Sequence, residues 1–317
     1  MFRNSHMLAP TDFSPHAAEA LRRAKALAKT YDGTLHLLHV ADARLAQRRP
    51  HVPEDAASPY GAPGLERMGE TASKWLEDLA RELRAEGVTV ETHTAAGRPA
   101  EEIMRMADEL QCGLIVIATH GHTGFDRFVF GGVCDQVIRR ARIPVLSVRP
   151  RSDGGADGDG AGAQGPIRRV LFPTDFSAFA GKVQPHAVSL CKELGAELVL
   201  FHATEMPVIL PEFMLEETVP ARDQMEQYAW DALEHLRKEI TDVPVTIQST
   251  VGTPYREICQ AIETMGIDLA VLPTHGRSGL VRIFFGGVAE RVVRRAVCPV
   301  LTIRPELSPE LEAGTGL

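Results

Sequence analysis

The sequence lacks the motifs that mark several large classes of nucleotide and metal enzymes. It has no GxxxxGK[ST] segment, which excludes a P-loop NTPase, and no GxGxxG follows its first apolar run, which weakens a dinucleotide-binding interpretation. The HxE and PCxxC pair of zinc deaminases is also absent. No apolar run reaches the roughly 18 residues that a membrane-spanning helix needs. We therefore expect a soluble protein outside these classes.

Cysteine and net positive charge are scarce as well. The chain of 317 residues has five cysteines, which form no CxxC pair and no spacing typical of metal ligands. An odd cysteine count without a signal peptide predicts the reducing cytoplasm. Lys and Arg total 34 against 42 Asp and Glu, so the net charge is −8. This charge argues against nucleic acid as a partner.

The dominant feature that is present is an internal duplication. Residues 118–150 recur as 273–305, and MLAPTDFS at 7–14 recurs as VLFPTDFS at 170–177. A Gly- and Asp-rich stretch between the copies cannot build a core and is typical of a flexible linker. The length and the repeat predict two domains with a linker and a tail. Their bounds are 1–150, 151–166 for the linker, 167–306, and 307–317 for the tail.

Short apolar runs alternate with helical stretches in each copy, which predicts an α/β fold with a doubly wound parallel sheet. Trp75 and Trp230 fall in the long helices and are expected to pack on the sheet. Cys112 is expected to precede a strand as a buried apolar residue. In the first copy we expect strands at 6–9, 34–40, 88–95, 114–118 and 145–148, and helices at 15–29, 66–86, 99–110 and 133–141.

Two loops recur directly after predicted strand ends, where open parallel sheets bind ligands. A Pro-Thr-Asp turn ending at Asp12 follows the first strand. A Thr-His-Gly turn ending at Gly121 follows the fourth, and after nine further residues Gly131 and Gly132 lead into a helix at Val133. If the first and fourth strands are neighbours, Asp12 and Gly121 face one crevice. An aspartate there suits ribose hydroxyls, and a glycine-rich helix start suits phosphates.

Other interpretations of these residues stay open. Asp12 and Asp175 can instead serve as Asx-turn residues for the helices that follow them. The glycine-rich stretch can be a tight loop that closes a βαβ unit. His120 and His275 have no nucleophile beside them and no second histidine at metal spacing, so catalysis is the weaker interpretation.

Taken together, these motifs make the chain resemble a tandem-domain member of the universal stress protein family. The resemblance rests on PTDFS near each start, THG, the nine-residue spacer before Gly-Gly, and the closing PVLSVRP and PVLTIRP. It implies a five-stranded, Rossmann-like parallel sheet of the adenine nucleotide alpha hydrolase type in each half. It also implies a cytoplasmic, ATP-binding regulator of the stress response without dedicated catalysis. Pairing through the last strands is expected, between the two halves or between two chains.

The ATP-binding branch of the family carries Gly, two residues, Gly, nine residues, Gly and then Ser or Thr. Here Ala118 and Pro273 replace the first glycine, while Gly132 and Gly287 replace the Ser or Thr. The resemblance implies ATP as the ligand, with or without Mg²⁺ or Mn²⁺ on its phosphates. The site residues that it implies are Pro10, Thr11, Asp12, Val40, Ala118, His120, Gly121, Gly131, Gly132 and Val133 in the first copy, and Pro173, Asp175, Ala203, His275, Gly276, Gly286, Gly287 and Val288 in the second.

These departures predict weaker binding and a difference between the copies. A hydrogen bond to a charged group is worth about 1.5–3 kcal/mol, so loss of the hydroxyl weakens ATP binding roughly 10- to 100-fold. Pro273 also removes a backbone N–H and fixes φ, so we expect the first copy to bind ATP better than the second. The alternatives are an interaction protein that has lost nucleotide binding and a slow ATP hydrolase.

Overall fold

The computed structural model describes residues 6–42, 65–119, 132–149, 166–205, 222–274 and 286–304. The chain divides into two compact units, which we call the first unit (residues 2–150) and the second unit (residues 151–317). None of the described helices is long and apolar enough to cross a membrane.

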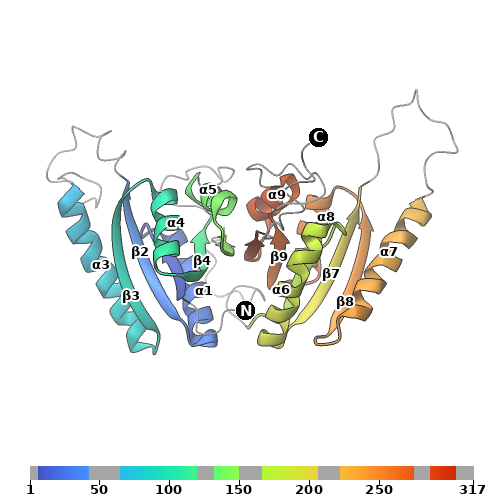
Figure 1. The fold of residues 1–317 in the computed structure, drawn as a ribbon, viewed down its shortest axis with the longest axis horizontal. Helices are drawn as coiled ribbons and strands as arrows, with labels where there is room; N and C mark the ends of the chain where they lie inside the picture. The colour runs from blue at the N-terminus through green and yellow to red at the C-terminus, as the bar shows by residue number, and fades with distance from the viewer. Residues whose placement is uncertain are drawn as a thin grey trace, which may run out of the picture. The chain divides into compact units, whose positions relative to one another are not determined.

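The first unit is built on a parallel sheet with the strand order β3-β2-β1-β4-β5 (Figure 1). The chain moves outward from β1 to β3 and then crosses to β4 and β5 on the other side of β1. Because parallel crossovers are right-handed, these two directions place α1 and α3 on one face and α4 and α5 on the other. The strands are β1 (His6–Pro10), β2 (Thr34–Asp42), β3 (Thr89–Gly97), β4 (Cys112–Ala118) and β5 (Val145–Val148), and the helices are α1 (Pro15–Tyr31), α3 (Leu65–Ala85), α4 (Pro99–Glu109) and α5 (Gly132–Arg140).

The second unit repeats this plan with the strand order β8-β7-β6-β9-β10, again parallel throughout (Figure 1). The predicted doubly wound α/β sheet is therefore confirmed in both units. The strands are β6 (Arg169–Pro173), β7 (Glu197–Thr204), β8 (Val245–Val251), β9 (Leu269–Pro273) and β10 (Val300–Ile303), and the helices are α6 (Ala178–Leu194), α7 (Arg222–Glu239), α8 (Pro254–Thr264) and α9 (Gly287–Arg295).

The core of each unit is its central strands, which helices cover on both faces. In β4, Leu114, Ile115 and Val116 are completely inaccessible to solvent. This burial explains the unbroken apolar runs in the sequence, since a strand covered on both faces has no polar side to alternate with. Cys112 is buried as expected, but it begins β4 instead of preceding the strand.

The two tryptophans, which we predicted to pack on the sheet, are only partly covered, and Trp230 lines a pocket together with Ser249, Thr250 and Val251 of β8. Trp75 in α3 is 37% exposed, and Trp230 in α7 is 44% exposed. The Trp75 ring meets the Phe13 ring edge-on, with 5.1 Å between their centroids. Trp75 therefore contacts the turn after β1, while Ala72, Leu76, Ala80 and Leu83 fill the buried positions of α3.

The serine cap of α1 gives a first testable prediction. The Ser14 hydroxyl accepts a hydrogen bond from the Ala17 N–H at 3.1 Å, and Pro15 occupies the first turn. Ser14→Ala should lower the unfolding free energy of the first unit by about 1 kcal/mol, because an amide at the helix start loses its acceptor. Urea unfolding followed by Trp75 fluorescence in a Trp230→Phe background measures this change. Ser14→Thr keeps the acceptor, so equal losses in Ser14→Ala and Ser14→Thr would contradict the assignment.

Candidate functional site

The first and fourth strands of each unit are neighbours, as the proposed crevice requires. In the first unit Met7 lies in register with Leu114, and Leu8 with Ile115. The connections leave β1 and β4 in opposite directions, and open α/β sheets bind ligands beyond the carboxyl ends of two such strands. Asp12 and Thr119 follow these two strand ends directly. The same adjacency holds between β6 and β9 in the second unit.

The turn after β1 is fixed by a set of short side-chain contacts. The Thr11 hydroxyl accepts from the Phe13 N–H, and the Asp12 Oδ1 accepts from the Ser14 N–H, each at 3.0 Å. Phe13 adopts a left-handed backbone with φ of 61°, which is costly for a side chain of this size. The Asx-turn interpretation of Asp12 is therefore correct. The turn holds the partly exposed Asp12 carboxylate in one place just beyond the carboxyl end of β1.

The second unit reproduces this turn contact for contact. The Thr174 hydroxyl accepts from the Phe176 N–H, and the Asp175 Oδ1 accepts from the Ser177 N–H, again at 3.0 Å. Phe176 has a φ of 59°, within 2° of the angle at Phe13. A strained backbone conformation persists only where the surrounding structure enforces it, so the same contacts fix this turn in both units.

The start of α9 is tied to the end of β9 and has no side-chain cap. The Gly286 N–H donates to the Thr274 carbonyl at 2.9 Å, which returns the chain to the strand end before the helix begins. The cap residue Gly286 has no side chain that could accept a hydrogen bond from the first backbone N–H groups of α9. At the start of α6, by contrast, the Ser177 side chain accepts such a bond. Exposed amides at a helix start carry partial positive charge and bind anions such as phosphate.

Comparison with known proteins assigns the chain to a family. The universal stress protein family profile matches residues 3–149 and again residues 166–304. The chain belongs to the universal stress protein family. Because the profile matches twice, it is a tandem-domain member.

Curated relatives agree with this assignment, and a solved structure agrees with the fold. A universal stress protein of Mycolicibacterium smegmatis is 25% identical over 309 residues, which cover 94% of this chain and 97% of that protein. A universal stress protein of Methanocaldococcus jannaschii is 32% identical over 141 residues, 43% of this chain and 82% of that protein. The crystal structure of a universal stress protein from Archaeoglobus fulgidus has a TM-score of 0.69 and covers 96% of this chain and all of that one. At 21% identity it shows the fold alone.

The structure of this universal stress protein brings part of the predicted site together. The residues that end β1 and β4 meet at one edge of the first sheet, and the following helix α5 begins with the predicted glycine. Placed in the first unit are Pro10, Thr11, Asp12, Val40, Ala118, Gly132 and Val133, and in the second Pro173, Asp175, Ala203, Gly286, Gly287 and Val288. His120, Gly121, Gly131, His275 and Gly276 lie outside the described residues, so their roles stay predictions.

A histidine behind each turn, which is buried in the first unit (His39) and partly exposed in the second (His202), was missed from the sequence. The His39 Nδ1–H donates to the Thr11 carbonyl at 2.9 Å, and the His202 Nδ1–H donates to the Thr174 carbonyl at 2.8 Å. The Phe13 ring lies over His39, with 4.9 Å between ring centroids. Burial is the main influence on the His39 pKa and lowers it, so the ring stays neutral near pH 7. The repeated histidine at the ends of TLHLLH and ELVLFH was the available signal.

These histidines are positioning residues for the universal stress protein turn. Each holds the carbonyl of the threonine directly before the aspartate, while the phenylalanine after the aspartate covers the ring. The aspartate is thereby held from the strand side and from the helix side. A ligand that bonds to Asp12 meets a carboxylate whose rotamer is already selected, which lowers the entropy cost of binding.

Proposed function

We propose that this universal stress protein binds ATP in the crevice of its first unit and acts as a nucleotide-dependent regulator without dedicated catalysis. The observation that carries the proposal is the Asp12 carboxylate, held by an Asx turn at the point where the winding of the sheet reverses. An acidic group at this place suits ribose hydroxyls, and the adjoining helix start suits phosphates. Val40, two residues before the end of β2, is proposed to contact the adenine.

The first residues of α5 favour a phosphate over a protein contact. Gly132 opens the helix and is exposed, and a β-carbon there would meet no atom within 4 Å among the described residues outside its own turn. The helix start is therefore open to a ligand. In the second unit Pro273 ends β9, so no backbone N–H is available at that position. We infer that the first unit binds ATP more tightly than the second.

A divalent ion at this site would be bound by the phosphates of the nucleotide and not by the protein alone. Asp12, the carboxylate at the rim of the crevice, is engaged by the backbone N–H of Ser14. Mg²⁺ typically keeps most of its water and binds substrate phosphates. We therefore propose that Mg²⁺ or Mn²⁺ accompanies ATP on its phosphates. The expected pairing through the last strands and the cytoplasmic location stay predictions.

Substitution of Asp12 tests the proposal. Asp12→Asn keeps an oxygen for the Asx turn but removes the second carboxylate oxygen, so ATP binding should weaken roughly 10- to 100-fold. Asp175→Asn makes the same change in the second unit and should leave the tighter binding event unchanged. Isothermal titration of nucleotide-stripped protein measures both. Chromatography of the nucleotide released by denaturation reports what the purified protein carries.

Three outcomes separate the proposal from its alternatives. No binding at millimolar ATP would favour the interaction protein. Phosphate release above a protein-free control that disappears in Asp12→Asn would favour a slow ATP hydrolase. A larger effect of Asp175→Asn than of Asp12→Asn on the tighter event would reverse the order of the two units.

A further inference from the structure

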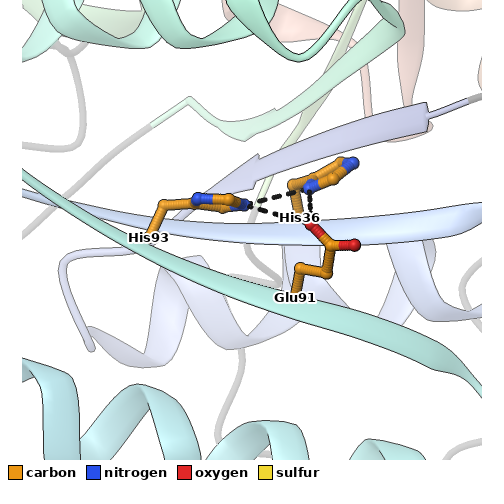
Figure 2. Close-up of side chains that lie close together, drawn as sticks. All are labelled: His36, Glu91 and His93. Carbon is orange, nitrogen blue, oxygen red and sulfur yellow. Dashed lines mark hydrogen bonds and ion pairs between the residues drawn. The ribbon is translucent and has the colours of Figure 1, made fainter.

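Three side chains from two neighbouring strands of the first unit converge at one point on the sheet (Figure 2). The His36 Nδ1 lies 3.0 Å from the His93 Nε2 and 3.4 Å from the Glu91 Oε2. The His93 Nε2 lies 3.9 Å from the same Glu91 oxygen. Each residue thus directs one metal-ligating atom at a common centre. Among the described residues, no other group of three His, Cys, Asp or Glu side chains does so.

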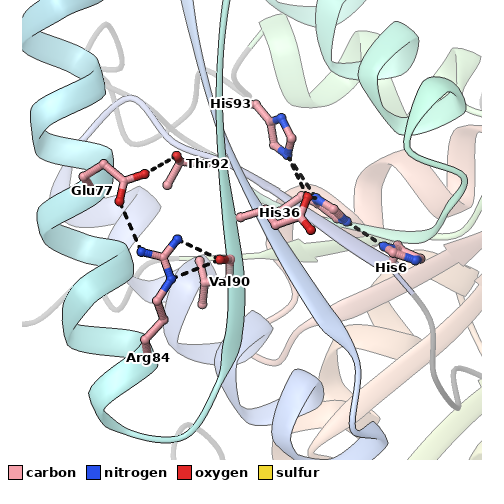
Figure 3. Close-up of polar contacts among 8 residues, drawn as sticks. His6, His36, Glu77, Arg84, Val90, Thr92 and His93 are labelled. Atoms are coloured by element: carbon pink, nitrogen blue, oxygen red, sulfur yellow. Dashed lines mark hydrogen bonds and ion pairs between the residues drawn. The ribbon is translucent and has the colours of Figure 1, made fainter.

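The strand register produces this convergence. His36 of β2 pairs with Glu91 of β3, and His93 stands two residues further along β3 on the same face. The nearby arginine of α3 is committed to the opposite face, where Arg84 binds Glu77 and the Val90 carbonyl (Figure 3). The ion pairs of Glu91 among the described residues are those with His36 and His93.

We propose that His36, Glu91 and His93 form a binding site for one Zn²⁺ ion in the first unit. Two imidazoles and one carboxylate are a common zinc ligand set, and imidazole ligands argue against Mg²⁺ or Ca²⁺. Ligand bonds of about 2.0–2.1 Å in a tetrahedron separate the ligand atoms by about 3.3 Å. The three observed separations, 3.0, 3.4 and 3.9 Å, lie around this value.

The ligands of the proposed site differ in burial, so one is fixed by packing and another faces the solvent. The His36 side chain is 2% exposed, whereas the Glu91 side chain is 57% exposed. His36 is thus fixed by packing, and Glu91 can adjust to an incoming ion from the solvent side. Three protein ligands leave the fourth position to water on that side.

His6 acts as a positioning residue for His36. The His6 Nδ1 lies 2.7 Å from the His36 Nε2, the ring nitrogen that faces away from Glu91 and His93 (Figure 3). A zinc-bound histidine normally donates its other ring N–H to an acceptor, which fixes the ring and its tautomer. The His6 ring also stacks on the His36 ring, with 5.0 Å between centroids. His6 of β1 therefore supplies the outer contact that such a ligand needs.

The second unit lacks these ligands at equivalent register positions. Arg169 pairs with Glu197 where His6 pairs with Thr34, and Val199 pairs with Thr246 where His36 pairs with Glu91. Gln248 stands at the place of His93. The same sheet thus folds without the cluster, so the cluster is not required by the fold. The site is also separate from the proposed nucleotide crevice, because His36 is the third residue of β2 and the crevice lies beyond the strand ends.

Residues of the second unit supply substitutions that the fold already tolerates. Wild-type protein, stripped of metal with EDTA and free of nucleotide, should bind one Zn²⁺ per chain in isothermal titration. His36→Val and His93→Gln should each weaken this binding by about 100-fold or more. His6→Ala should weaken it about 10- to 100-fold, the usual effect of losing an outer partner. Zn²⁺ should raise the melting temperature of the wild type and not that of His93→Gln.

His235→Gln is the matched control. His235 pairs with Glu239 on an exposed helix face at 3.3 Å, and no described residue supplies a third ligand, so its loss should leave Zn²⁺ binding unchanged. Circular dichroism tests whether each variant is folded. His93→Gln changes a partly exposed residue, so we expect it to fold and to provide the test even if His36→Val unfolds. No stoichiometric Zn²⁺ binding to the wild type, or wild-type binding by folded His93→Gln, would overturn the proposal in favour of a hydrogen-bonded histidine chain.

Discussion

Phe172→Ala should lower the unfolding free energy of the second unit by about 3–5 kcal/mol, the usual cost of truncating a buried aromatic residue. Phe172 lies in β6, the central strand of its sheet, and its side chain is completely inaccessible to solvent. Strands β7 and β9 flank it and restrict collapse into the space left behind. Most of the lost contacts would therefore remain unreplaced, which places the cost in the upper part of the range for single substitutions.

The single tryptophan of each unit allows this change to be located. In a Trp75→Phe background the remaining fluorescence reports Trp230 of the second unit, so the urea transition of that unit can be followed alone. Phe172→Leu is the control, since it keeps most of the volume and should cost less than about 1.5 kcal/mol. A loss below about 1 kcal/mol for Phe172→Ala would show that the site relaxes or is not the core of the unit.

The sequence was sufficient for the fold because local signals and burial agree. The apolar runs of β1, β4 and β5 are buried on both faces, and the serine-proline start of α1 is a true cap. The repeat supplied a second copy of each signal. The adjacency of β1 and β4, on which the proposed crevice depends, was only a condition in the sequence analysis, because alternating strands and helices predict a parallel sheet but not its strand order.

Features that depend on backbone conformation or on tertiary contacts could not be predicted from local sequence signals. The left-handed backbone of Phe13 is unexpected for an aromatic residue, and the turn chemistry of Thr11 and Asp12 overrides its preference. The position of Trp75 in a long helix predicts packing on the sheet, although large aromatic residues are rarely fully buried. The position of such a ring depends on the loop beside it.

The histidine cluster shows a further limit of sequence reasoning. His6, His36 and His93 lie on three strands, and 30 and 57 residues separate the neighbouring pairs. No spacing rule for metal ligands covers such distances in the chain. The cluster exists only through the register of β1, β2 and β3, and a slip of one residue in any strand would turn its side chain to the opposite face.

Gly132→Ser is expected to tighten ATP binding to the first unit roughly 10- to 100-fold. The hydroxyl would stand in the first turn of α5, where a charged phosphate oxygen can accept a hydrogen bond worth about 1.5–3 kcal/mol. A β-carbon at Gly132 meets no atom within 4 Å among the parts of the chain that the structure describes, so the substitution requires no repacking there. The exposed position also means that stability should change by less than about 1 kcal/mol. Isothermal titration with ATP measures the gain.

Two control variants separate the hydroxyl from other effects of losing a glycine. Gly132→Ala adds the β-carbon and stiffens the helix start but offers no donor, so it should bind ATP as the wild type does. Gly181→Ser makes the same chemical change in α6, at an exposed position where a β-carbon also has open space. It should leave ATP binding unchanged. Equal affinities of Gly132→Ser and Gly132→Ala would mean that no phosphate oxygen lies within reach of α5. Because the helix start is the proposed phosphate contact, that result would place the nucleotide elsewhere even if Asp12→Asn weakened its binding.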